Sequence, residues 1–134
     1  MDAMMQTRRA LAIAVLLTAG VTATVAAHHS FAAYYFEDQM IDYEGVVSGV
    51  EFKAPHVWLH VAARDQSGKP RAYSAEWSNP TRLERDGITK DTLKIDDVVH
   101  VWGAPSKNAS DNRVHLKRIQ RPSDGWQWGM NRRR

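Results

Sequence analysis

IDYEGVVSGVEF, residues 41–52, is the stretch that decides the fold. Ile41, Tyr43 and Val47 follow the alternation of a β-strand, in which every second side chain points to the same face. Gly45 and Gly49 interrupt this alternation, and isolated glycines within a strand indicate bulges or sharp bends. The stretch therefore predicts a long, bent first strand, which suits a small barrel.

Four more strands and one helix are expected after it. The strands are predicted over His56–Ala63, Arg71–Trp77, Val98–Gly103 and Arg113–Gln120, and the turn composition of Asp65–Pro70 makes the second and third a hairpin. A short helix follows the third strand, because Asn79 suits the N-cap, Pro80 the first helical position and Gly87 the stop. The order β-β-β-α-β-β predicts an all-β fold, a small five-stranded OB-like barrel with one short helix between strands three and four.

The pairing of the last two strands can be predicted further. The simplest hairpin register sets Val99 opposite Leu116 on the core face. It places His100 opposite His115 on the outer face. Ile119 breaks the alternation of the last strand, so a register shifted by two residues stays open as the alternative.

The first residues have the plan of a secretory signal peptide. Arg8 and Arg9 form a basic segment, residues 10–26 carry no charge, and the small residues Val25-Ala26-Ala27 suit a signal peptidase. We therefore expect residues 1–27 to be cleaved, which leaves a periplasmic or secreted protein without a stable membrane anchor. A transmembrane anchor is the alternative, although a span needs ~20 apolar residues. Residues 28–122 are expected to form the barrel and 123–134 a basic, flexible tail.

Charge and cysteine content exclude several classes of protein. The net charge is +3, and three of the bases are Arg132, Arg133 and Arg134. A nearly neutral folded body gives no electrostatic sign of nucleic-acid binding. The absence of cysteine from the sequence excludes a disulfide framework, a thiolate metal site and a cysteine nucleophile.

The expected cleavage site suggests a metal site. Cleavage after Ala27 makes His28 the first residue of the exported protein, with His29 next. The α-amine and ring of His28, joined by His29 or by His56 if the chain start folds back over the second strand, give a nitrogen-rich site that suits Cu(II). The alternative is that His28 and His29 are a solvated chain start and that His56 is a hydrogen-bonded residue at the strand entrance.

A ligand-binding surface is predicted on the outer face of the second and third strands. His56, Trp58 and Glu76 lie there, with Asn79 at the start of the helix. A carboxylate near a histidine is also typical of general bases, which leaves chemistry by Glu76 and His56 open. The alternatives are that Glu76 caps the helix or pairs with Arg82 and that Trp58 seals the rim of the core. The sequence has no Ser-His-Asp spacing and no phosphate-binding glycine loop.

Several short motifs together resemble one family. They are His28-His29-Ser30-Phe31, Ala54-Pro55-His56-Val57-Trp58-Leu59, Ala75-Glu76-Trp77-Ser78-Asn79-Pro80 and Gly103-Ala104-Pro105. This combination resembles DUF6152, a family of exported bacterial proteins, over nearly all of residues 28–120. The family usually has Asn-Pro-His where this chain has Ala54-Pro55-His56. The resemblance implies export and a small β-barrel and supplies no reaction.

The sequence thus predicts an exported, non-enzymatic binding or accessory module for a small molecule, a metal or a periplasmic protein. The first alternative is binding of copper or another transition metal through His28, His29 and His56. The second is a small-molecule hydrolase or isomerase that uses Glu76 and His56.

Overall fold

The computed structural model describes residues 30–65 and 67–129. They contain strands β1 (Ile41–Glu51), β2 (Trp58–Arg64), β3 (Pro70–Glu76), β4 (Val98–Pro105), β5 (Arg113–Arg121) and β6 (Trp126–Trp128). They also contain two short helices, α2 (Ser30–Tyr34) and α3 (Pro80–Arg85). The chain divides into two compact units, residues 1–33 and 34–134, and all six strands belong to the second.

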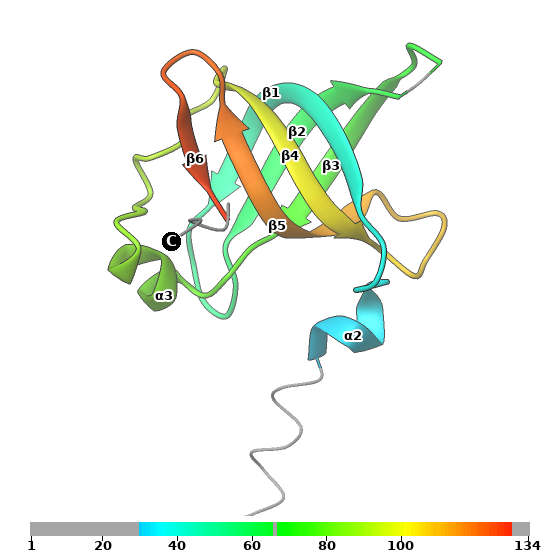
Figure 1. Ribbon diagram of the computed structural model, residues 1–134, viewed down its shortest axis with the longest axis horizontal. Coiled ribbons are helices and arrows are strands. Elements are labelled where there is room, and N and C mark those ends of the chain that lie inside the picture. The colour runs from blue at the N-terminus through cyan, green and yellow to red at the C-terminus, as the bar shows by residue number, and fades with distance from the viewer. Residues whose placement is uncertain (1–29, 66, 130–134) are drawn as a thin grey trace, which may run out of the picture. The chain divides into compact units, whose positions relative to one another are not determined.

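Strands β1 to β5 close into a barrel (Figure 1). The sheet order is β3-β2-β1-β4-β5-β6, with antiparallel neighbours. A parallel pairing of Ser74–Glu76 in β3 with Arg113–His115 in β5 closes the ring. Helix α3 lies between β3 and β4 in the chain, so the predicted five-stranded, OB-like barrel is confirmed.

The bend of β1 arises at its glycines. The pairing of β1 with β2 shifts register between Val47 and Gly49, as the interrupted alternation predicted. Gly45 permits a close approach of the two strands, because a Cβ there would lie 2.5 Å from the backbone oxygen of Ala62 and 2.7 Å from Cγ1 of Val61. Any side chain at this position would push β2 away from β1.

The core fills the barrel, and α3 closes one end of it. The core side chains with no exposed surface are those of Val57, Leu59, Val61, Ala75, Leu83, Val99, Val101, Val114 and Ile119. Helix α3 begins as predicted, since Pro80 is its first residue and Oδ1 of Asn79 accepts a hydrogen bond from the Arg82 amide at 2.9 Å. In Figure 1, α3 lies at one end of the barrel and the β2–β3 and β4–β5 loops lie at the other.

The predicted register of the β4–β5 hairpin is wrong. Gly103 pairs with Leu116 and Trp102 with Arg118, so Lys117 is an extra residue that forms a bulge in β5. The bulge resolves the broken alternation seen in the sequence, because it returns Ile119 to the core face. The side chain that the bulge adds on the outer face belongs to Lys117, which is half-buried.

The predicted pairing of His100 with His115 is also wrong, because Leu116 lies opposite Gly103 rather than Val99 and the whole register is displaced. His100 lies opposite Gln120, and His115 lies opposite Ala104. Alternation of apolar residues fixes which face a side chain takes, but a shift by an even number of residues keeps that face and changes the partner, so alternation alone does not specify the pairing.

The prediction of a flexible tail over residues 123–134 is wrong for Trp126–Trp128, which form β6 beside β5. Trp128 packs edge-on against Trp77, with ring centroids 5.2 Å apart, and its Nε1 donates to Oδ2 of Asp86 at 3.0 Å. Burial of the indoles therefore attaches this segment to the barrel. Residues 130–134 and the predicted signal peptide, 1–27, lie outside the described residues. Within the described part, no helix is long and apolar enough to cross a membrane.

Candidate functional site

Glu76 lies where β3 contacts both of its neighbours. Trp58 of β2 and His115 of β5 are its direct pairing partners. Residues that lie directly opposite one another share a face of the sheet. The next residue, Trp77, is in the core with 2% of its surface exposed, so Glu76 and its two partners face outward.

Both carboxylate oxygens of Glu76 accept hydrogen bonds. The hydroxyl of Tyr35 donates to Oε2 at 2.5 Å, and Nδ1 of His56 lies 2.7 Å from Oε1. An ionised carboxylate is only an acceptor, so Glu76 in that form places the proton of the His56 ring on Nδ1. The pair thereby fixes the orientation and the tautomer of the imidazole.

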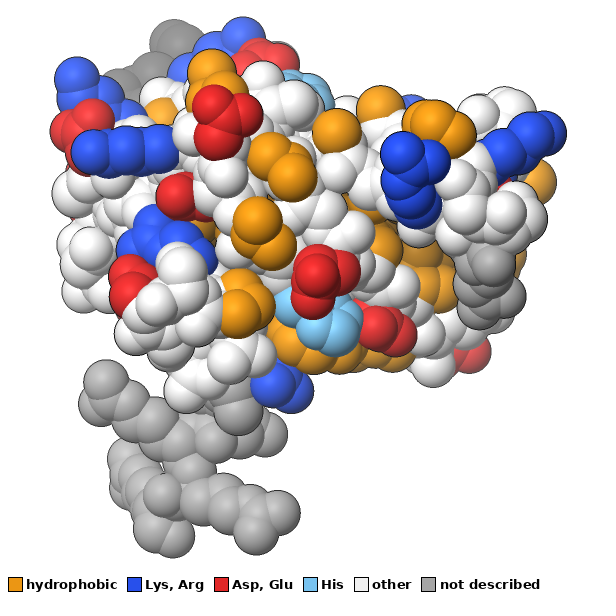
Figure 2. Space-filling model, turned by 90° about the horizontal axis from the view of Figure 1, so that it is seen from above, with side chains coloured by type: hydrophobic (Ala, Val, Ile, Leu, Met, Phe, Trp, Pro, Cys, Tyr) orange, Lys and Arg blue, Asp and Glu red, His pale blue; other side chains and the backbone are white. Residues whose placement is uncertain are grey.

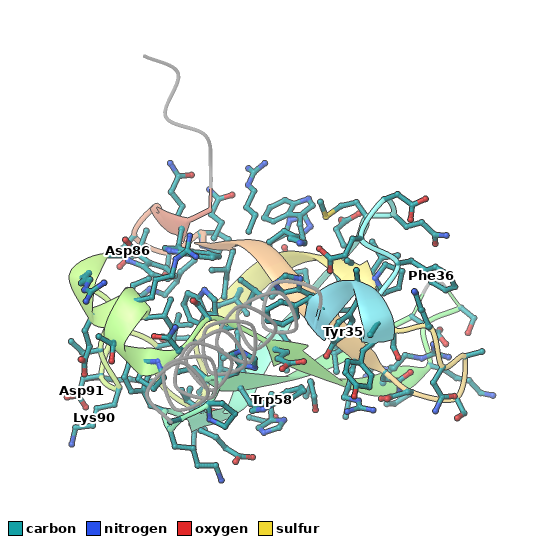
Figure 3. The ribbon with its side chains drawn as sticks, turned by 90° about the horizontal axis from the view of Figure 1, so that it is seen from below. Tyr35, Phe36, Trp58, Asp86, Lys90 and Asp91 are labelled. Carbon is teal, nitrogen blue, oxygen red and sulfur yellow. The ribbon has the colours of Figure 1, made fainter. Side chains whose placement is uncertain are left out.

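The backbone places Tyr35 and His56 at this carboxylate. The amide of Phe36 donates to Pro105 O at 2.9 Å, which ties the segment around Tyr35 to the end of β4. Just before β2 begins, the amide of Val57 donates to Ser78 O at 3.0 Å and so holds His56 near the end of β3. In Figure 3, Trp58 and Tyr35 lie along the molecule between the α3 end, marked by Asp86, and Phe36 at the other end.

The three side chains differ in how much solvent they meet. Tyr35 is 2% exposed, and burial together with its hydrogen bond to Glu76 raises the pKa of its hydroxyl well above the usual range. Tyr35 is therefore a permanent donor at neutral pH. The side chains of Glu76 and His56 are 16% and 28% exposed, so an approaching molecule meets the imidazole more readily than the carboxylate.

A second histidine and carboxylate adjoin this group. Nδ1 of His115 lies 2.7 Å from Oε1 of Glu37, and Lys117 donates to Oε2 of the same carboxylate. The His115 ring lies 5.8 Å from the ring of Tyr35. Burial lowers the pKa of His115 despite the hydrogen bond to Glu37. Burial would raise the pKa of Glu37, but the hydrogen bonds from Lys117 and His115 outweigh it and lower that pKa.

Each histidine that the structure describes has a carboxylate partner. The nitrogen–oxygen distances are 2.7 Å for His56–Glu76, 2.9 Å for His60–Glu51, 2.7 Å for His100–Asp42 and 2.7 Å for His115–Glu37. Figure 2 shows a histidine side chain beside acidic ones on one face of the molecule. The partners are between 9 and 78 residues apart in sequence, so no short sequence motif predicts these pairs.

The predicted site residues that the structure describes separate into two groups. The structure brings His56, Trp58 and Glu76 together, and Tyr35 joins them from a segment that the sequence did not single out. Asn79 is exposed and caps α3. The hydrogen bonds of Glu76 go to Tyr35 and His56 rather than to Arg82 or the helix amides.

The predicted metal ligands His28 and His29 lie outside the described residues. Among residues 30–65 and 67–129, no group of three His, Asp or Glu side chains is placed to hold a metal ion. His56 is the one predicted ligand that lies among the described residues, and its Nδ1 lies 2.7 Å from Oε1 of Glu76.

Comparison with known proteins gives one match. The sequence profile of DUF6152, a family of unknown function, matches residues 15–115. No curated protein and no solved structure matches the chain.

Proposed function

The chain belongs to the DUF6152 family, and we propose that it is an exported, non-enzymatic binding or accessory module. The observation that carries the proposal is Glu76, which accepts hydrogen bonds from both Tyr35 and His56 beside Trp58. The signal-peptide pattern of residues 1–27 supports a periplasmic or secreted location.

The hydrogen bonds that Glu76 already accepts favour a binding role over a catalytic one. A general base must present a lone pair to the proton that it removes. Both oxygens of Glu76 already accept hydrogen bonds, and the side chain is largely buried. These contacts suit a positioning residue that holds His56 in one orientation, because an imidazole fixed in advance loses little conformational entropy when it contacts a ligand.

Trp58 supplies the apolar part of the proposed surface. The indole is half-buried, and its strand partners are Glu51 in β1 and Glu76 in β3. An indole offers a broad contact area and a hydrogen-bond donor together. A ligand on this surface would pack on Trp58 and exchange a hydrogen bond with His56.

Native mass spectrometry of the protein isolated gently from the periplasm or the medium tests the proposal. We expect an additional non-covalent mass on the wild-type protein and its loss from the His56→Gln and Trp58→Ala variants. His100→Gln is the matched control, because His100 also pairs with a carboxylate at 2.7 Å and its side chain is 30% exposed. The control should retain the additional mass.

Two results would contradict this assignment. A wild-type protein that carries no additional mass has no tightly held ligand on this surface. Conversion of the bound molecule into a product of different mass, blocked by Glu76→Gln, would instead support the hydrolase or isomerase alternative.

Copper binding is a second candidate function, and the hydrogen bond between His56 and Glu76 favours it. Histidines that bind metals usually donate their other ring nitrogen to a carboxylate, which fixes the tautomer and strengthens the ligand. With Nδ1 of His56 directed to Glu76, Nε2 is the nitrogen that would bind the ion. His28 and His29 would supply the remaining nitrogens if export leaves His28 as the first residue.

Titration with Cu(II) tests this candidate on a protein that begins at His28 and on one with a single extra residue before it. The extension removes the α-amine from the chelate, so we expect much weaker binding. Glu76→Gln should weaken binding by roughly 10- to 100-fold, whereas His100→Gln should have no effect. Affinity should fall below about pH 6.5, where imidazole takes up a proton. Equal affinities in the two forms would exclude the chelate.

A further inference from the structure

A cavity of about 470 Å³ opens beside the β2–β3 hairpin, and in Figure 1 this hairpin lies at the end of the barrel opposite α3. Its walls come from the start of β1 and from the β2–β3 hairpin. Tyr43 and Tyr73 line it with stacked rings, whose centroids are 4.0 Å apart at an interplanar angle of 11°. Ligand sites for small molecules commonly measure about 300–1,000 Å³, so the cavity has room for a small organic ligand.

The lining is apolar where it meets the core and charged at its mouth. Tyr73 pairs with the buried Val61, which places its side chain on the inner face of the barrel. Arg71 is two residues away on the same strand and therefore shares that face. Ile41 at the start of β1 adds an aliphatic wall. A ligand in the cavity would therefore contact aromatic and aliphatic surface with a guanidinium beside it.

The acidic groups of the lining already have donors. Oδ1 of Asp65 accepts from the amides of Ser67 and Lys69 at 2.9 and 3.0 Å, which holds the hairpin turn. Oδ2 of Asp42 lies 2.7 Å from Nε2 of His100. These carboxylates are therefore poor candidates to receive a cationic ligand.

The two arginines of the lining use few of their N–H donors on the described residues. The ion pair of Arg71 with Asp65 is long, at 3.6 Å. Arg64 uses Nη1 on the carbonyl of Gly68 at 2.9 Å. A guanidinium has five N–H donors in a planar fork that matches a carboxylate, so both residues can donate hydrogen bonds to an anionic group.

One residue that lines the cavity, Tyr43, carries a buried polar atom. Tyr43 is 6% exposed, and its hydroxyl has no hydrogen-bond partner among the described residues. A buried donor without an acceptor costs free energy. A ligand oxygen held at the stacked tyrosines would provide an acceptor after a small movement of the ring.

We propose that this cavity binds a small planar organic carboxylate, with its ring against Tyr73 and its carboxylate on Arg71 and Arg64. The site is distinct from the surface at His56 and Trp58. Trp58 begins β2 and Arg64 ends it, which separates the two places by about 20 Å along the strand. The proposal adds a ligand class to the binding role, and it depends on Arg71, Arg64 and Tyr73 rather than on His56 and Trp58.

Isothermal titration calorimetry of the exported protein with benzoate tests the proposal, with benzamide as the uncharged analogue of the same shape. We expect benzoate to bind and benzamide to bind at least about tenfold more weakly, because hydrogen bonds to charged groups are stronger than those to neutral ones. Arg71→Gln should weaken benzoate binding by about tenfold or more, and Arg64→Gln by less.

Arg82→Gln on α3 is the matched control, because it removes the same charge at the closed end of the barrel. It should leave the affinity for benzoate unchanged, as should His56→Gln. Circular dichroism of each variant checks that the barrel is folded. Absence of benzoate binding at millimolar concentration, or equal affinities of wild type and Arg71→Gln, would overturn the proposal. Loss of benzoate binding in His56→Gln would place the anion at the other site instead.

Discussion

The two ends of the barrel are built from different side chains. Helix α3 and the segment after it close one end with Leu83, Ile88 and Leu93, which are between 0% and 4% exposed. The other end has the stacked pair Tyr43 and Tyr73 beneath an open cavity. One end therefore buries hydrocarbon completely, and the other leaves aromatic and charged groups within reach of solvent.

Stability and binding are therefore expected to depend on opposite ends of this small barrel. Apolar area removed from water stabilises the fold, so the closed end should contribute more to the free energy of unfolding. Among the described residues, the open end contains donors without an acceptor, such as the Tyr43 hydroxyl, and recognition of a ligand requires such groups. Substitutions at the two ends should therefore change different measurements.

The largest effect is expected at the closed end. Leu83→Ala removes a fully buried side chain and should lower the free energy of unfolding by about 2–5 kcal/mol. Urea unfolding followed by tryptophan fluorescence measures it. Ile41→Ala at the open end is the matched substitution and should cost less, since Ile41 is only half-buried. Equal losses of stability in the two variants would show that the closed end does not contribute more to the free energy of unfolding than the open end.

A smaller loss of stability is expected from the helix cap. Asn79→Ala removes the acceptor for the Arg82 amide and should cost about 1 kcal/mol in the same unfolding measurement. Asn79→Ser keeps an N-cap acceptor and should restore most of the stability. If Asn79→Ser retains stability and loses the mass bound at His56 and Trp58, Asn79 contacts the ligand as the sequence predicted.

The stability of the barrel should depend on pH through His115, which lies in the wall between the two ends. Burial lowers its folded pKa, so the unfolded chain takes up the proton first as the pH falls. Stability should therefore decrease as the pH drops below about 6.5, the ordinary value for histidine. Glu37, whose folded pKa is also lowered, should add a loss at more acidic pH.

His115→Gln should remove the first part of this loss. The free energy of unfolding, compared between neutral pH and about pH 5.5, should fall less in the variant than in the wild type. Melting temperatures at the same two pH values provide an independent measurement. An identical decrease in both proteins would show that His115 does not carry the effect.

The smallest effect is expected at the open end. Tyr43→Phe removes a buried hydroxyl without a partner among the described residues and keeps the ring stacked on Tyr73. The free energy of unfolding should change by no more than about 1 kcal/mol and in the stabilising direction. A larger decrease in the free energy of unfolding, measured with urea, would mean that the Tyr43 hydroxyl makes a hydrogen bond in the folded protein.

Local signals in the sequence were sufficient where the structure depends on neighbours along the chain. Asn79 and Pro80 begin α3 as predicted. Asp65 forms its turn by hydrogen bonds to residues two and four positions ahead. The register shift beside Gly49 is also where the interrupted alternation put it. Each of these features involves interactions within a few residues, which a sequence displays directly.

The candidate site was only partly visible in the sequence. His56, Trp58 and Glu76 were placed on one face because strand alternation determines the face. Tyr35 was missed, since it reaches Glu76 from 41 residues away. No spacing rule connects a residue before the first strand to the end of the third.

The order of the five barrel strands and of helix α3, the inner and outer face of each of these strands, and the family were thus readable from the sequence alone. Only the tertiary structure decided the bulge at Lys117, the place of β6, the carboxylate partner of each described histidine and the open cavity. The physical reason is that periodicity specifies a face but not a register. Partners across a closed barrel are selected by how all the strands pack together.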